Sequence, residues 1–245
     1  MTLLEIALDD VAGAGVAEHA GADRIELCAG LGDGGITPSI GLIYTVADQL
    51  SSASLMVLIR PRAGDFVFTR EEVRVMLADI KEIRHRVPTA GFVIGALEPL
   101  GDVDAKTTAA LVAECAGASV TFNKAFDSTR DLSRSLETLI DLGVHRVLTS
   151  GGRRSALDGV REIRHLVEQS GNRIGIMAAG SVRPNTAATL VAATGVTEVH
   201  LRAAVTRAGP SVWSNPEQDY GNATVSVTDD RIVRSMVTAL EGVRG

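Results

Sequence analysis

The sequence predicts an α/β fold in which a single domain forms a TIM, or (β/α)8, barrel. Three observations favour this fold. Eight short apolar segments alternate with helical ones, the joints between them repeat, and the 245 residues match the roughly 250 of a typical barrel. A doubly wound open sheet is the competing fold, but the sequence has no strand–GxGxxG–helix joint. We therefore treat residues 1–245 as one domain.

The expected strands are short and rich in Val, Ile and Leu, as buried parallel strands are. They cover residues 3–8, 23–28, 55–60, 92–97, 118–123, 145–150, 173–178 and 197–202.

The helices between these strands are indicated by their apolar spacing. In 70–87, apolar residues recur at intervals of three and four. Thr69 and Glu72 have the spacing of a capping box at its start. Pro184 fits the first turn of a helix at about 184–193.

The joints from helix to strand repeat along the chain. Gly21-Ala-Asp-Arg-Ile-Glu-Leu, Gly143-Val-His-Arg-Val-Leu-Thr and Gly195-Val-Thr-Glu-Val-His-Leu each begin with a glycine suited to end a helix in the left-handed conformation. A strand follows two residues later, as a chain of βα units requires.

One long irregular stretch, at about 203–228, interrupts this pattern. It contains Pro210, Trp213, Pro216 and Tyr220. Loops of this length are usually functional or disordered. A lid, a partner-binding surface and a solvated excursion before the last helix all fit it.

Composition excludes several classes of protein. The net charge of −6 argues against a nucleic-acid surface, which needs clustered Lys and Arg. No apolar run of 18 residues exists to span a membrane, and no basic segment marks a secretory signal. With only Cys28 and Cys115, a disulfide scaffold is excluded and the cytoplasm is the expected compartment.

Alternation along the strands places charged residues inside the barrel. The aligned joints put Ile25, Val147 and Val199 on the face covered by helices. The opposite face then carries Glu5, Glu26, Cys28, Arg60, Asn123, Ser150, His200 and Arg202. Buried charge costs several kcal/mol unless it is paired or used. Two interpretations follow: an ion-paired plug, for example Glu26 with Arg60, or a site at the carboxyl ends of the strands.

The loops after the strands add groups that could hold an anion. Arg60, Arg62 and Asp65 follow the third strand. Later loops contribute Asn123, Lys124, Asp127, Ser150, Gly151, Gly180 and Ser181. Small, glycine-bearing turns before helices expose backbone N–H groups to anions.

Five segments in order, Gly21–Cys28, Gly34–Ser39, Ile59–Phe66, Val120–Asp127 and Arg146–Gly151, resemble the CutC copper-homeostasis family. The similarity runs over roughly residues 3–205. It implies a cytoplasmic TIM-barrel protein, commonly a homo-oligomer, linked to copper homeostasis and proposed to bind copper. Two departures stand out. Asn123-Lys124 replaces the family's usual His-Arg, and His200 is followed by Leu-Arg rather than by small residues.

Two functional interpretations stay open. In the first, the protein binds copper, and Cys28, which matches the family's cysteine, is the one well-placed thiol; no CxxC or HxxxH spacing supports a metal independently. In the second, the barrel is a lyase-, isomerase- or aldolase-type enzyme for a small phosphorylated or carboxylated metabolite. Its proton carriers would be Glu5, Glu26, Asp127 and His200, and the loop residues above would hold the anion. No organic cofactor is expected. An interaction scaffold based on 203–228 is a third class, but it leaves the charged interior unexplained.

Overall fold

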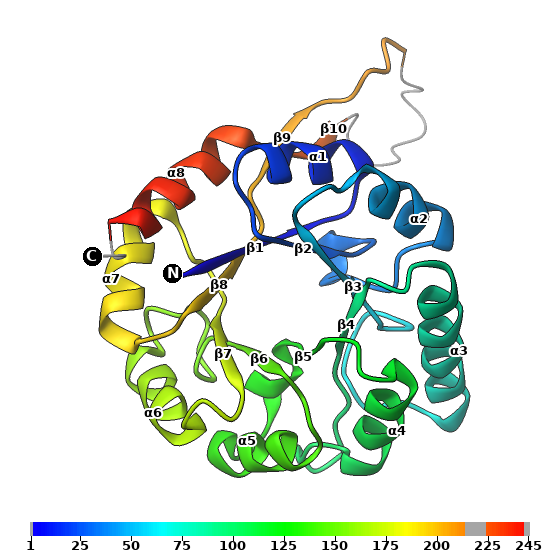
Figure 1. Ribbon diagram of the computed structural model, residues 1–245, viewed down its shortest axis with the longest axis vertical. Helices are drawn as coiled ribbons and strands as arrows, with labels where there is room; N and C mark the ends of the chain where they lie inside the picture. The colour runs from blue at the N-terminus through cyan, green and yellow to red at the C-terminus, as the bar shows by residue number, and fades with distance from the viewer. Residues whose placement is uncertain (1, 214–223, 243–245) are drawn as a thin grey trace.

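The computed structural model describes residues 2–213 and 224–242 and shows a closed barrel of eight parallel strands (Figure 1). The strands are β1 Leu3–Leu8, β2 Arg24–Leu27, β3 Ser54–Leu58, β4 Gly91–Ile94, β5 Val120–Phe122, β6 Arg146–Thr149, β7 Gly175–Ala178 and β8 Glu198–Leu201. The helices around them are α1 Val11–His19, α2 Ile40–Gln49, α3 Arg70–Arg86, α4 Ala105–Cys115, α5 Leu132–Asp141, α6 Val160–Ser170, α7 Pro184–Thr194 and α8 Asp230–Glu241. The predicted TIM barrel is confirmed.

The local signals that predicted the elements act as expected. Thr69 Oγ accepts from the backbone N–H of Glu72, whose carboxylate accepts in return from the N–H of Thr69, so the capping box starts α3. Gly21 and Gly195 adopt φ of +101° and +77° between helix and strand. Such left-handed positions favour glycine because it has no Cβ.

Strand register sets which residues face inward. β8 pairs with β1 to close the barrel, and Glu5 lies opposite His200. On the other side of β1, Glu5 lies opposite Arg24 of β2. Ile25 and Val199, in the other phase, are fully buried in the layer between strands and helices. The inward-facing Glu5, Glu26 and His200 therefore come from the adjacent strands β1, β2 and β8.

Apolar side chains fill other parts of the barrel interior. Cys28, Met56, Leu58 and Val93 form one buried cluster. Leu148, Met177 and Ala179 form another. These two clusters form part of the packed interior of the barrel.

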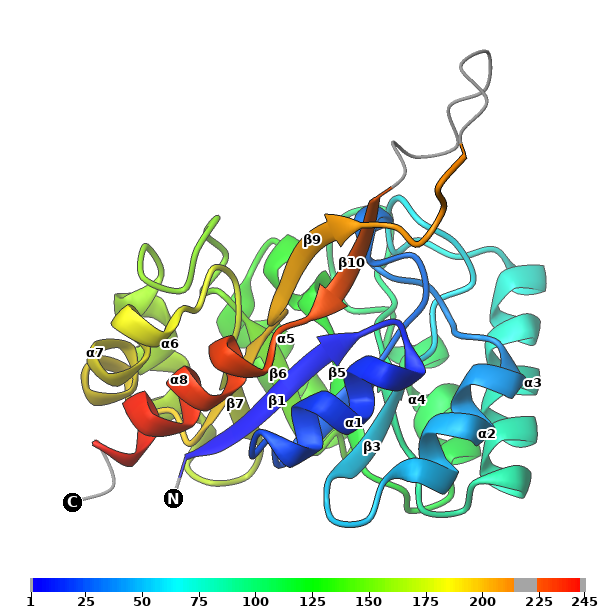
Figure 2. The same cartoon turned by 90° about the horizontal axis from the view of Figure 1, so that it is seen from above.

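The stretch 203–228 is more ordered than expected where it is described. β9 (Ala204–Ala208) and β10 (Thr224–Thr228) pair in an antiparallel ribbon that rises beyond the barrel (Figure 2). Trp213 is 73% exposed. Pro216 and Tyr220 lie outside the described residues. Among the described residues, no helix has both the length and the hydropathy to cross a membrane.

Candidate functional site at the barrel mouth

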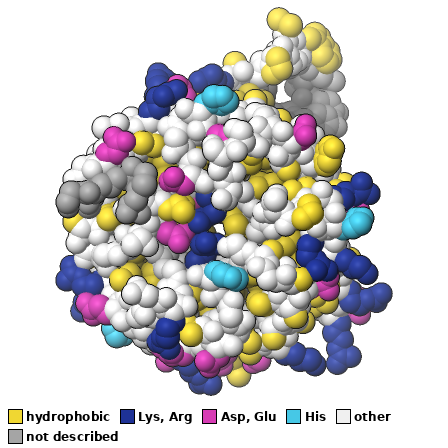
Figure 3. Space-filling model, in the orientation of Figure 1, with side chains coloured by type: hydrophobic (Ala, Val, Ile, Leu, Met, Phe, Trp, Pro, Cys, Tyr) yellow, Lys and Arg dark blue, Asp and Glu magenta, His cyan; other side chains and the backbone are white. Residues whose placement is uncertain are grey.

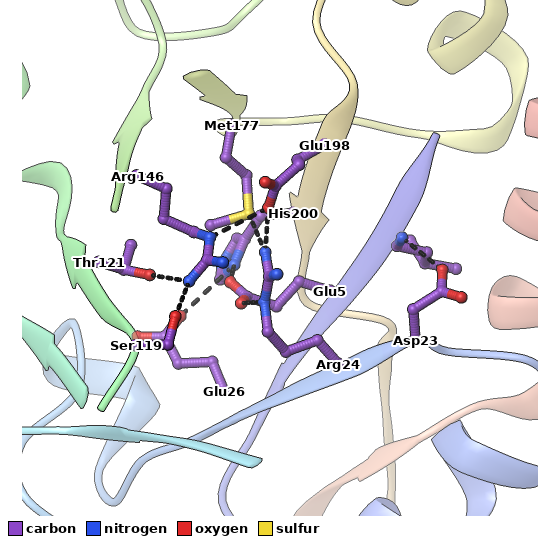
Figure 4. A network of polar contacts seen from close by, with 11 residues as sticks. Glu5, Asp23, Arg24, Glu26, Ser119, Thr121, Arg146, Met177, Glu198 and His200 are labelled. Carbon is purple, nitrogen blue, oxygen red and sulfur yellow. Dashed lines mark hydrogen bonds and ion pairs between the residues drawn. The ribbon is translucent and has the colours of Figure 1, made fainter. Parts of the chain in front are cut away.

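Three side chains from adjacent strands meet inside the barrel: Glu5 of β1, Glu26 of β2 and His200 of β8 (Figure 4). His200 Nδ1 lies 2.7 Å from Glu5 Oε1 and 3.4 Å from Glu26 Oε2. One ligand atom from each residue lies within 4.8 Å of the other two. Because an ionised carboxylate only accepts hydrogen bonds, Nδ1 must be the donor to Glu5. We call these three residues the inner cluster.

A second set of charges supports the inner cluster from the start of the strands. Arg24 donates to Glu5 through Nε and to Glu198 through Nη2, and Nη2 also lies 3.2 Å from Met177 Sδ. Arg146 lies 3.2 Å from Glu198 and donates to Ser119 and Thr121. Figure 3 shows basic and acidic side chains side by side near the centre of the barrel. The guanidinium of Arg24 therefore fixes one oxygen of Glu5 and leaves the other to His200.

The environment shifts the pKa values of the two carboxyl groups of the inner cluster in opposite directions. Burial alone would raise the pKa of Glu5, but the hydrogen bond from His200 and the charge of Arg24 outweigh it and lower the pKa to about 2. For Glu26, burial dominates and raises the pKa to about 7, although the charge of His200 opposes it. Burial would lower the pKa of His200, yet Glu5 and Glu26 together raise it. At neutral pH, Glu5 is therefore an anion and the carboxyl group of Glu26 is close to its pKa, while the two neighbouring glutamates favour the protonated form of His200.

A cavity of about 450 Å³ opens beside His200 at the carboxyl ends of the strands. Its basic side chains are Lys124, Arg183 and Arg202. Gly180 and Ser181 line it from the loop before α7, and Val205 and Ser226 line it from the β9–β10 ribbon. His200, whose side chain is 13% exposed, thus belongs both to the inner cluster and to this mouth cavity.

Similarity to known proteins covers nearly the whole chain. Residues 2–205 match the CutC family. A CutC family protein of Pasteurella multocida is 41% identical over 97% of this chain and 98% of its own. This chain belongs to the CutC family. The human copper homeostasis protein cutC homolog is 39% identical over 96% of this chain and 87% of its own length.

Solved structures agree with this assignment. The CutC crystal structure from Streptococcus agalactiae has a TM-score of 0.78 and 31% identity, and covers 82% of this chain and 98% of that chain. Thiamine phosphate pyrophosphorylase from Pyrococcus furiosus, with a TM-score of 0.61 and 13% identity over 100% of this chain and 97% of that one, shows the shared barrel fold alone. The family resemblance read from the sequence motifs is confirmed.

Asp127 organises the loops after β5 and β6. Its carboxylate accepts from Lys124 Nζ at 2.6 Å, from Thr149 Oγ1 at 2.6 Å, and from the N–H groups of Ser150 and Gly152. Burial would raise the pKa of Asp127, but the charge of Lys124 lowers it. Because the carboxylate accepts hydrogen bonds from all of these groups, it holds the two loops together. It also holds the ammonium of Lys124 at the mouth cavity.

Asn123, Ser150 and Gly151 act within the same loops. Asn123 Oδ1 accepts from the N–H of Ala125 and so caps the 3₁₀ turn at Lys124–Ser128. Ser150 Oγ lies 2.7 Å from Lys124 Nζ. Gly151 donates its N–H to Thr149 Oγ1. Of the loop residues expected to hold an anion, Lys124, Gly180 and Ser181 line the mouth cavity.

The basic residues after β3 lie elsewhere. Arg60 donates to the carbonyls of Gly35 and Gly64 and lies 4.7 Å from the ring centroid of Phe66. The Glu26–Arg60 pair, given as an example of the ion-paired interpretation, does not form; Arg24 supplies the buried cation next to the inner cluster instead. Arg60 therefore joins two loops, because carbonyl oxygens of both lie within reach of its guanidinium.

Arg62 and Asp65 pair with each other at 3.0 Å, and Arg62 also binds Glu72 at 2.6 Å. These contacts fix the loop before α3. Neither residue lines the mouth cavity.

Cys28 faces inward, as expected, but it lies among apolar side chains. It is 1% exposed and packs with Met56, Leu58 and Val93. Burial raises the pKa of the Cys28 thiol well above its usual range. Cys115 is buried in the core that the helices share with the barrel wall. A protonated, enclosed thiol is a weak metal ligand, because the thiolate is the form that binds.

Sequence reasoning missed Arg24, Arg146 and Glu198. Each is the first residue of its strand, whereas functional sites in this fold lie at the carboxyl ends of the strands. The signal was available: Arg24 shares the inward phase of Glu26, and Glu198 shares that of His200.

Proposed function

We propose that this protein serves copper homeostasis, the role carried in the name of its human relative, and that it binds a copper ion at Glu5, Glu26 and His200. The observation that supports this is the inner cluster itself: two carboxylates and one imidazole from three adjacent strands, with ligand atoms within 4.8 Å of one another. His200 connects this set to the mouth cavity, which gives an ion a way in.

The donor set favours the cupric state. Imidazole nitrogen and carboxylate oxygen suit Cu²⁺, which also binds such ligands more strongly than its divalent neighbours do. Cuprous copper prefers sulfur, and the thiol nearest in sequence, Cys28, is held in its protonated form. Arg24 would act as an outer partner that orients Glu5, a role that commonly tunes metal affinity.

Copper binding at this site would be linked to proton release. A metal ligand must be deprotonated, while Glu5 and Glu26 raise the pKa of His200 and burial raises the pKa of Glu26 to about 7. Affinity for Cu²⁺ should therefore rise as the pH is raised from 6 to 8. A site built on ligands that are already ionised would show little change over that range.

The cytoplasm and a homo-oligomeric state belong to this proposal. Both cysteines are free, which suits a reducing compartment. Sedimentation of the purified protein would test whether it forms dimers or larger assemblies.

A second candidate function rests on a different observation. The charged side chains among the described residues that line the mouth cavity are basic, which favours an anionic ligand over a free cation. His200 in contact with Glu26 forms a pair suited to proton transfer near pH 7. A barrel enzyme acting on a small anionic metabolite would use both features.

Calorimetric titration distinguishes the two candidate functions. Cu²⁺ is titrated into the wild type, His200→Gln and Cys28→Ser, and Cu⁺ is titrated under reducing conditions. We expect one Cu²⁺ per wild-type chain, affinity reduced at least about tenfold in His200→Gln, and no change in Cys28→Ser. Loss of binding in Cys28→Ser, or preference for Cu⁺, would move the site to the thiol. Absence of binding by the wild type would leave the second candidate.

A further inference from the structure

We infer that the mouth cavity binds a small phosphorylated metabolite through its phosphate group, held by Lys124, Arg183 and Arg202. This inference does not depend on copper binding. It names the ligand class that the second candidate function requires. It keeps Lys124 from the sequence prediction and assigns to Arg183 and Arg202 the part that was expected of Arg60 and Arg62.

The charge of the cavity is one-sided. Three of its lining residues are Lys or Arg, and His200 forms part of its wall. Among the described residues that line it, there is no Asp or Glu. A cleft lined by one sign of charge raises the local concentration of counter-ions, and a phosphate dianion carries the charge to match.

Two of the three basic groups retain capacity for a ligand. Arg183 donates to the carbonyl of Val182 and, within the described part of the chain, forms no ion pair. Arg202 donates to Ser226 Oγ at 2.9 Å, while its nearest carboxylate, Asp9, is 3.9 Å away. A guanidinium carries five N–H donors, so both side chains have donors left for phosphate oxygens.

Lys124 is held in place at the same cavity. Its ammonium lies 2.6 Å from Asp127 and 2.7 Å from Ser150 Oγ. These two contacts use two of its three donors and fix its position before a ligand arrives. A positioned cation loses less entropy on binding than a mobile one.

The backbone around the cavity adds to this arrangement. Gly180 and Ser181 have φ of +96° and +56°, so two consecutive residues between β7 and α7 are left-handed. A non-glycine residue with this geometry is uncommon and is found mostly where a ligand or a tight turn demands it. Arg183 is the N-cap of α7, so the positive end of that helix dipole also lies at the cavity. The loop after the seventh strand is a frequent phosphate site in this fold.

The size of the cavity sets the kind of molecule. A volume of about 450 Å³ lies in the range of small-molecule sites. With phosphate at the basic side chains, the rest of the molecule would extend toward His200. The inferred ligand is therefore a phosphate monoester of a small polar compound rather than a nucleic acid.

Binding can be tested with metal-free protein in the presence of a chelator, so that failure of the copper proposal does not affect the result. Inorganic phosphate and glycerol phosphate are titrated at constant ionic strength, with acetate as the carboxylate probe, and binding is followed by NMR or calorimetry. The variants are Arg183→Gln and Arg202→Gln. The matched control is Arg74→Gln, on the exposed surface of α3.

We expect saturable binding of both phosphates. Affinity should fall about tenfold in Arg183→Gln and in Arg202→Gln, since each loses one charge-assisted contact, and should be unchanged in Arg74→Gln. Acetate should bind more weakly than phosphate. The inference is overturned if the wild type does not saturate with either phosphate, if acetate binds as tightly as phosphate, or if all three variants have the same affinity for phosphate.

Discussion

Glu26→Gln offers the sharpest test of the electrostatics of the inner cluster. The amide keeps the size of the side chain and removes the ionisable group. In the folded protein burial raises the pKa of Glu26 to about 7, whereas its ordinary value is 4.5. Between these two pH values the folded chain keeps a proton that the unfolded chain has released, so the wild type loses stability as the pH rises. The loss is complete above pH 7 and amounts to about 3 kcal/mol.

Glu26→Gln does not lose stability in this pH range, because its amide does not ionise. We expect Glu26→Gln to be more stable than the wild type by less than about 1 kcal/mol at pH 5 and by up to about 3 kcal/mol at pH 8. In a chain of this size that corresponds to about 6–12 °C in melting temperature. Urea unfolding and thermal melts at pH 5, 6, 7 and 8 give the comparison. A difference that does not grow with pH, or a variant less stable at pH 8, would refute the reasoning.

Three further predictions concern the neighbouring charges. Glu5→Gln should behave in the opposite way: because the folded pKa of Glu5 is lowered to about 2, the wild type gains stability from about pH 2 to 4.5, and the variant should be less stable by about 3 kcal/mol in neutral urea melts. Arg24→Leu removes the buried cation shared by Glu5 and Glu198 and should cost about 3–5 kcal/mol, whereas Arg173→Leu, at the exposed pair with Glu137, should leave stability nearly unchanged in the same assay. Asp127→Asn should cost about 1–3 kcal/mol and increase proteolysis of the loop after β6, and equal cleavage of variant and wild type would argue against its role as a loop organiser.

The barrel could be predicted from its eight alternating segments and repeated joints, and the inward direction of Glu26 and His200 from the period of two in strands. Once Ile25 and Val199 were assigned to the helix-covered face, the opposite phase contained Glu26 and His200, and the structure places both inside. The same period also predicts that Arg24, at the start of β2, faces inward.

The loop residues could not be placed in this way, since side chains in loops follow no period. Arg60 turns to the carbonyls of Gly35 and Gly64, and nothing in the local sequence specifies those partners. Nor was the ribbon predicted. The alternating Thr224–Thr228 is a strand signal, but its partner Ala204–Ala208 is too distant for a short hairpin signal. Arg183 and Arg202 became neighbours of the cavity only through the folded arrangement of α7, β8 and the ribbon.

Electron paramagnetic resonance of protein loaded with one equivalent of Cu²⁺ tests most directly whether the inner cluster is the working site. We predict a spectrum typical of Cu²⁺ bound by one imidazole nitrogen and oxygen donors. The coupling to nitrogen should be lost in His200→Gln and retained in Cys28→Ser. A sulfur-ligand signature, or a spectrum that His200→Gln leaves unchanged, would contradict the assignment.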